Sequence, residues 1–148
     1  MKTKRIFLCL MLTISGTVLS QNPVSWSIHQ SEDKSSISIH AQIESGWHIY
    51  SLHVDENAGP ASTKFYFDKS DAFELVGQVS EPPSDEVFDE NFQAKLRFFE
   101  NQVTFEQKVK VLNNDTLTGS VVYMACNEDL CLPPQESKFK LKLIPPHE

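Results

Sequence analysis

Cysteine is scarce in this chain of 148 residues, which contains only three. Cys9 lies in an apolar N-terminal run, whereas Cys126 and Cys131 form a close pair near the C-terminus. The pair has no second close cysteine pair and no His-x-x-x-His beside it, and only His48 or His53 could contribute further ligands. The sequence therefore argues against a disulfide-rich framework and disfavours a metal site.

Basic residues are also few once the N-terminus is set aside. The first 20 residues carry three of the 13 basic residues and none of the 20 acidic ones, so residues 21–148 hold 10 basic and 20 acidic groups. Their formal charge of −10 follows from that difference. Such an acidic surface disfavours nucleic acid and anionic lipid as partners.

No apolar run after the N-terminus is long enough to cross a membrane. The N-terminus itself has basic residues, then an apolar run, then small and polar residues ending at Ser20, which is the order of a secretory signal peptide. We expect residues 1–20, including Cys9, to be removed, and residues 21–148 to form a single domain. The mature protein is expected to be exported, to the periplasm, where a disulfide persists.

Strict alternation of apolar and polar residues predicts three long strands. In residues 36–44, Ile37, Ile39, Ala41 and Ile43 share one face. The same period of two occurs in residues 103–111 and 138–143. Each of these segments is expected to be a half-buried strand.

Shorter strands and the turns between them complete the predicted fold. Turn residues separate the segments, and no helical stripe, repeat or low-complexity tract is present. About nine strands in one domain are typical of an all-β, immunoglobulin-like antiparallel β-sandwich. The shorter strands are expected at residues 24–29, 47–52, 63–67, 73–76, 96–99 and 117–124.

The close cysteine pair allows a structural and a redox interpretation. A bridge between Cys126 and Cys131 would close only a small loop, worth about 2 kcal/mol by chain entropy against more than about 4 for a loop of a hundred residues. A disulfide in a surface turn is open to an incoming thiolate and can change redox state without unfolding the sandwich. This favours thiol–disulfide exchange, with a purely structural disulfide in a secreted binding module as the alternative.

Two further segments contain candidate site residues. In residues 44–53, His48 and Tyr50 share a strand face opposite Trp47, either as ordinary surface residues or beside the cysteines, where they would tune thiolate formation. Residues 85–92 form an acidic loop with two aromatics. This is either a solvated loop or a mobile cover over the disulfide.

Three segments together resemble the N-terminal periplasmic domain of DsbD-type thiol:disulfide interchange proteins, the disulfide bond corrector family. They are Gly46-Trp-His-Ile-Tyr50, Asp89-Glu-Asn-Phe92 with the following residues 98–105, and Tyr123-Met-Ala-Cys-Asn-Glu-Asp-Leu-Cys-Leu-Pro-Pro-Gln-Glu136. The last block is the most specific. The resemblance covers nearly all of residues 21–148, in order.

This resemblance implies an immunoglobulin-like relay of reducing equivalents, without metal or organic cofactor. Electrons would come from a membrane reductase through its thioredoxin-like domain and pass to exported disulfide isomerases or thioredoxin-like clients. Cys126 and Cys131 would be the redox pair of this thiol:disulfide oxidoreductase, and Cys131 would form mixed disulfides. Phe92 would be the cap aromatic beside Asp89 and Glu90, with His48 and Tyr50 lining the site.

The chain departs from the family pattern in three ways. Well-known members carry tyrosine where this chain has His48, and the spacer between their cysteines is longer. An imidazole can titrate near neutral pH whereas a phenol does not, so the role of His48 is not inherited from the family. No transmembrane region or thioredoxin-like domain follows Glu148, so the electron donor is expected to be a separate, membrane-bound polypeptide.

Overall fold

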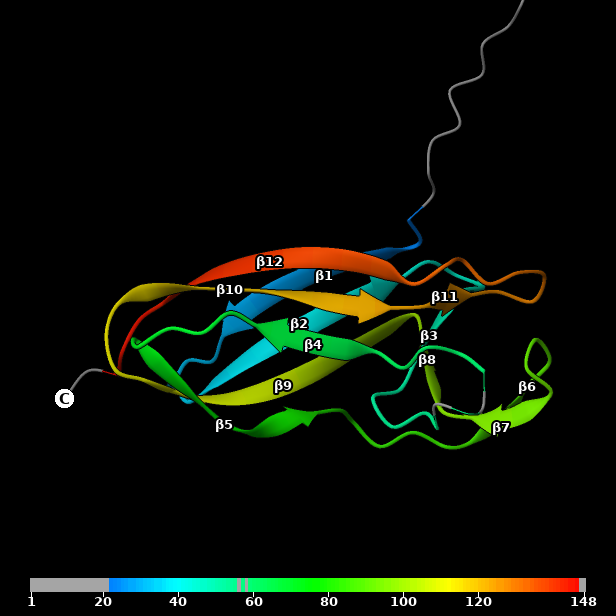
Figure 1. Cartoon of the computed structure of the whole chain (residues 1–148), viewed down its shortest axis with the longest axis horizontal. Helices are drawn as coiled ribbons and strands as arrows, with labels where there is room; N and C mark the ends of the chain where they lie inside the picture. The colour runs from blue at the N-terminus through cyan, green and yellow to red at the C-terminus, as the bar shows by residue number, and fades with distance from the viewer. Residues whose placement is uncertain (1–21, 56, 58, 147–148) are drawn as a thin grey trace, which may run out of the picture.

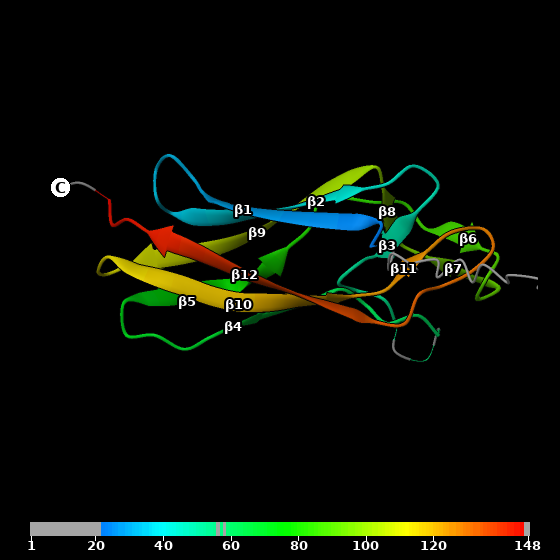
Figure 2. The same ribbon diagram turned by 90° about the horizontal axis from the view of Figure 1, so that it is seen from above.

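The computed structural model describes residues 22–55, 57 and 59–146, and in these ranges all regular secondary structure is β-strand. Two antiparallel sheets run along the molecule (Figures 1 and 2). The larger sheet has the order β1-β2-β9-β5, from Val24–Gln30, Ser36–Ile43, Gln102–Val111 and Phe73–Ser80. The second has the order β12-β10-β4, from Gln135–Leu143, Asp115–Tyr123 and Lys64–Phe67. The predicted β-sandwich is confirmed.

Strands β2 and β9 show why these segments form the centre of the sandwich. Ile37, Ile39, Ala41 and Ile43 alternate with polar residues, and all four are at most 2% exposed. Strand β9 alternates in the same way along its whole length. Facing side chains from both sheets bury the apolar halves of these strands in one core, and this burial is the main term that stabilises the fold.

A small third sheet lies at one end of the sandwich and carries the cysteines. Its order is β11-β3-β8, from Ala125–Cys126, His48–Tyr50 and Phe98–Glu100. A hairpin of β6, Val87–Asp89, and β7, Ala94–Leu96, lies beside it (Figure 1). The third sheet and the hairpin bring two other parts of the chain, residues 48–50 and 87–100, to the end of the sandwich that carries the disulfide.

The structure corrects several predicted elements near this end. The predicted strand 96–99 is two strands, because the chain passes from β7 to β8 at Arg97, whose carbonyl accepts a bond from Ser51 N at 3.0 Å. The strand predicted at 47–52 is only β3, and residues 117–124 end at Tyr123 before β11 begins. Strand β6 lies where a loop was predicted, because Val87 and Phe88 are about half exposed and give no alternation.

The predicted signal peptide, residues 1–20, lies outside the described residues. Among residues that the structure does describe, no helix is long and apolar enough to cross a membrane.

Candidate functional site: a disulfide beside an aromatic and acidic hairpin

Cys126 and Cys131 form a disulfide at β11, an edge strand of the small sheet. The two residues face each other in an antiparallel bridge with their Cα atoms 4.0 Å apart. Cys126, in β11, is fully buried, whereas Cys131 is partly exposed. An incoming thiol therefore meets the sulfur of Cys131 first.

Asn127 holds the loop between the two cysteines. Its side-chain Oδ1 accepts hydrogen bonds from Asp129 N at 2.9 Å and Leu130 N at 2.8 Å. Its own N–H donates to the carbonyl of Leu130 at 2.9 Å. The loop is thus fixed by local hydrogen bonds that do not depend on the disulfide, as expected of an asparagine-led turn.

The disulfide belongs to an apolar cluster separate from the main core. Tyr50, Leu96 and Cys126 are its buried members, and Phe92 and Cys131 pack against them. The Phe92 ring meets the Tyr50 ring edge to face, with centroids 5.9 Å apart. Behind Phe92, Gly59 leaves no free space, because a Cβ there would collide with Cδ1 of the Phe92 ring.

A buried polar network joins β3 to the hairpin. The Tyr50 hydroxyl donates to Asp89 Oδ2 at 2.7 Å, and His48 Nε2 lies 3.1 Å from the Tyr50 oxygen and 3.4 Å from the same carboxylate oxygen. Asp89 is 3% exposed, Tyr50 is fully buried and His48 is 9% exposed. The interpretation of His48 and Tyr50 as ordinary surface residues is therefore wrong, because β11 and β8 flank β3 and the hairpin covers it.

Asp89 also shapes the turn that carries Phe92. Its Oδ1 accepts the backbone N–H groups of Asn91 at 2.9 Å and Phe92 at 3.1 Å. Asn91 Nδ2 then donates to the carbonyl of Asn127 at 2.9 Å. The Asp89 carboxylate thus fixes the position of Phe92, and Asn91 connects the hairpin to the cysteine loop.

Burial dominates the electrostatics of this network. Burial, followed by the hydrogen bond and negative charge of Asp89, raises the pKa of the Tyr50 hydroxyl well above its ordinary value. Burial lowers the pKa of His48, although the charges of Asp89 and Glu100 oppose that shift. Tyr50 is therefore a neutral hydrogen-bond donor at neutral pH. Burial favours the neutral form of the His48 imidazole over the protonated form.

Six of the seven predicted site residues are linked to one another by the contacts of the polar network and the apolar cluster. They are His48, Tyr50, Asp89, Phe92, Cys126 and Cys131. Glu90 differs, because it is exposed and its carboxylate accepts a bond from Gln93 Nε2 at 3.1 Å. It lines a shallow pocket of about 260 Å³ together with His48, Asp89, Glu100 and Glu128.

Sequence reasoning missed several residues that complete the site. Asn91 and Asn127 connect the hairpin to the cysteine loop, and Gly59 supports Phe92 from behind. Phe98 packs against the His48 ring with centroids 4.4 Å apart. Only Asn127 carried a local signal, as an asparagine inside a tight loop, since the other contacts depend on distant strands coming together.

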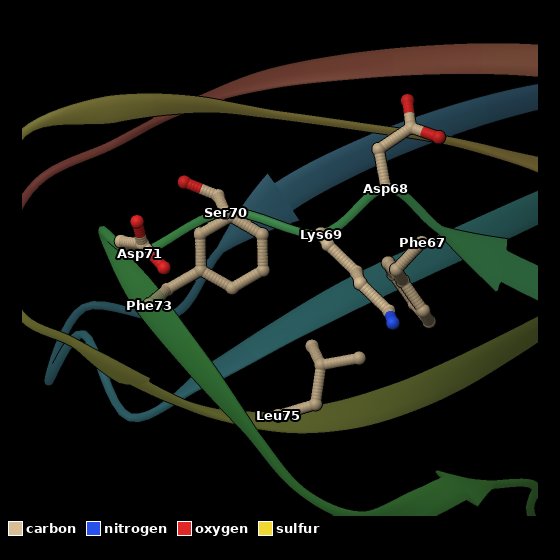
Figure 3. Close-up of a pocket in the computed structure, with 7 residues that line it drawn as sticks. All are labelled: Phe67, Asp68, Lys69, Ser70, Asp71, Phe73 and Leu75. Carbon is tan, nitrogen blue, oxygen red and sulfur yellow. The ribbon is translucent and has the colours of Figure 1, made fainter.

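Outside this site, the described residues contain a surface hollow but no candidate metal site. They contain no group of three or more His, Cys, Asp or Glu side chains that could hold a metal. A hollow at the other end of the sandwich is lined by Phe67, Lys69 and Leu75 among others (Figures 1 and 3). Two of its polar side chains bind β10, since Asp68 accepts from Thr118 and Ser70 donates to Asp115.

The fold and site define a class: a β-sandwich in which one partly exposed disulfide packs beside an aromatic and acidic hairpin. The family described as "Thiol:disulfide interchange protein DsbD, N-terminal" matches residues 16–143, and the chain belongs to this family. Thiol:disulfide interchange, as predicted from the sequence, is its function. No curated protein matches the chain.

Solved structures support the same assignment of fold. The reduced N-terminal domain of DsbD from Neisseria meningitidis aligns with a TM-score of 0.61 and 16% identity over 81% of this chain and 85% of that one. The same organism's complex of the DsbD and PilB N-terminal domains contains a chain that aligns with a TM-score of 0.60 and 14% identity, over 88% and 94%. The N-terminal periplasmic domain of ScsB from Proteus mirabilis aligns with a TM-score of 0.53 and 18% identity. This alignment covers 86% of this chain and 48% of that one. The immunoglobulin-like prediction is confirmed.

Proposed function

We propose that this domain relays reducing equivalents by opening and closing the Cys126–Cys131 disulfide, with Cys131 as the sulfur that partners attack. The observation that carries the proposal is the difference in exposure between the two sulfurs, since Cys126 is fully buried and Cys131 is partly exposed. Exchange requires in-line approach to one sulfur while the other leaves. Only Cys131 offers that approach.

The separation of the two apolar clusters supports a working cycle in the folded state. The main core is built from both large sheets, whereas the disulfide packs in the small cluster with Tyr50 and Leu96. Asn127 holds the cysteine loop without help from the bridge. Opening the disulfide therefore leaves the contacts that stabilise the sandwich in place.

The proposed exchange balances as a two-electron transfer. A partner thiolate attacks the Cys131 sulfur, the S–S bond breaks, and its electron pair leaves on the Cys126 sulfur. The partner's second thiolate then attacks the mixed disulfide, which releases Cys131 and leaves the partner oxidised. Reduction of a client runs in the reverse order. The Cys131 thiolate attacks the client disulfide and forms a new mixed disulfide, and Cys126 then attacks Cys131, which closes the bridge and releases the client with two more electrons.

The proposed donor is the thioredoxin-like domain of a membrane reductase, and the proposed clients are exported disulfide isomerases or thioredoxin-like proteins. The N-terminal domain of DsbD from Neisseria meningitidis forms a complex with the N-terminal domain of PilB, which supports docking through this type of domain.

The proposed location of the protein is the periplasm. The signal-like order of residues 1–20 and the periplasmic location of the ScsB domain support export to that compartment.

Reduction is expected to leave the domain folded. Because the bridge closes a loop with a sequence separation of only 5, its removal should lower the free energy of unfolding by no more than about 2 kcal/mol. Thiol counting after incubation with reduced thioredoxin, with circular dichroism and urea unfolding on the same sample, measures both quantities. The double variant C126S/C131S provides the matched stability control. A bridge that resists reduction, or a domain that unfolds when it is reduced, would support a structural brace instead.

Phe92 is proposed to shield the disulfide, so Phe92→Ala should make it react faster with a small thiol. We expect about a tenfold rise in the rate of reduction by dithiothreitol, equivalent to about 1.4 kcal/mol of local opening. Gly59→Ala should have the same effect, because its Cβ would displace the Phe92 ring and Gly59 has a φ of +112° that alanine rarely adopts. Phe88→Ala, on the same hairpin but 49% exposed, is the control. Equal rates for Phe92→Ala and Phe88→Ala would show that Phe92 shields nothing.

A further inference from the structure

The small sheet places a disulfide sulfur, an imidazole and a carboxylate in one row. Cys126 on β11 lies opposite His48 on β3, and His48 lies opposite Glu100 on β8. Residues directly opposite each other in antiparallel strands point to the same face, with Cβ atoms about 4.5–5.5 Å apart. His48 is therefore the immediate cross-strand neighbour of the buried sulfur that leaves when the disulfide opens.

The hydrogen bonds around His48 fix which ring nitrogen carries the proton. Tyr50 has one hydroxyl hydrogen and donates it to Asp89 at 2.7 Å, so the phenol oxygen can act towards His48 only as an acceptor. His48 Nε2, 3.1 Å from that oxygen, is then the N–H nitrogen of the neutral ring. Nδ1 remains as the nitrogen that can take up a second proton.

Charged and titratable groups face His48 from each strand and loop around it. Asp89 approaches from β6 at 3.4 Å, Glu100 from β8 and Tyr50 from β3 itself. Glu90 and Glu128 line the same shallow pocket, which connects His48 to solvent. Burial outweighs these carboxylates while the bridge is closed, because it lowers the pKa of His48. One additional negative charge beside the ring would favour its protonated form.

We propose that His48 is the proton-accepting group of the redox cycle, neutral beside the closed disulfide and protonated when Cys126 leaves as a thiolate. This inference rests on the proposed exchange reaction. When the S–S bond breaks, its electron pair stays on the Cys126 sulfur, and a proton from solvent reaches Nδ1 through the pocket. The imidazolium then balances the charge of the Cys126 thiolate, and reoxidation of the pair returns that proton to solvent.

Titration of His48 in the wild-type protein tests the proposal without any substitution. The imidazole signals of His48, followed by nuclear magnetic resonance against pH, should show a proton affinity at least about tenfold higher in the reduced than in the oxidised protein. The imidazole signals of His53, which is exposed and lies outside the small sheet, serve as the internal comparison. Equal titration of His48 in both redox states would overturn the proposal, even if exchange itself proceeds.

His48→Gln supplies the second test. Glutamine keeps an N–H donor for the Tyr50 oxygen but cannot take up a proton, and His53→Gln is the matched control. In the single-cysteine background C131S, the thiolate absorbance of Cys126 should appear about one pH unit higher with His48→Gln than without it. Identical midpoints would overturn the proposal. A wild-type domain that never exchanges with dithiols would instead refute the proposed function.

Discussion

Cys126→Ser is expected to form a stable mixed disulfide with a partner, whereas Cys131→Ser is expected to form almost none. The probe is a thioredoxin-like protein whose resolving cysteine is replaced by serine and whose remaining cysteine is activated as a mixed disulfide with thionitrobenzoate. The exposed Cys131 thiol should attack the activated sulfur and release thionitrobenzoate, and no neighbouring thiol remains to resolve the covalent complex. We expect the Cys126→Ser variant to release thionitrobenzoate at least about a hundredfold faster than the Cys131→Ser variant.

The physical reason is access rather than the intrinsic chemistry of the two thiols. Cys126 is fully buried between β3 and the hairpin, so a protein-sized partner reaches its sulfur only after local unfolding. Release of thionitrobenzoate and a non-reducing gel measure rate and yield. In urea, where the fold is lost, the two single-cysteine variants should react alike. Equal rates under native conditions, or faster reaction through Cys126, would refute the assignment of Cys131 as the attacked sulfur.

The sandwich itself was readable from the sequence because its long strands bury one face each. Alternation in β2 and β9 predicts the core residues, and the structure buries those residues. Alternation fails where a strand is exposed on both faces, as at Val87 and Phe88, or buried throughout, as in β3. Strands β6, β3 and β11 are of these two kinds, and β7 and β8 have only three residues each, too few to show alternation. The boundaries of these elements are therefore harder to predict than those of the main sheets.

The candidate site shows the same division between local and long-range information. The cysteine pair was evident from its spacing, and the resemblance brought in His48, Tyr50 and the hairpin. The sequence does not show that two adjacent acidic residues differ in burial, because burial depends on contacts with strands far apart in the chain. Asp89 is 3% exposed and accepts four hydrogen-bonding or ionic contacts, while its neighbour Glu90 is exposed. The pattern Asp-Glu alone assigns them equal roles.

That difference predicts unequal effects on stability. Asp89→Ala should lower the free energy of unfolding by about 3–5 kcal/mol, because it leaves the buried Tyr50 hydroxyl and the part-buried N–H groups of Asn91 and Phe92 without their acceptor. Glu90→Ala should change it by less than about 0.5 kcal/mol, since an exposed side chain with one local partner contributes little. Urea unfolding of the oxidised proteins measures both values.

Asp89→Asn separates the two tasks of the carboxylate. The amide oxygen can still accept the backbone N–H groups of Asn91 and Phe92, so the turn that carries Phe92 should survive. The amide nitrogen cannot accept the Tyr50 hydroxyl, so that contact must rearrange and the cost should be smaller, about 1–2 kcal/mol. If the carboxylate holds the cover over the disulfide, Asp89→Ala should also speed reduction by dithiothreitol, while Asp89→Asn should do so much less. An Asp89→Ala protein as stable as Glu90→Ala, and no more reactive, would mean that the hairpin is held in place by its apolar contacts alone.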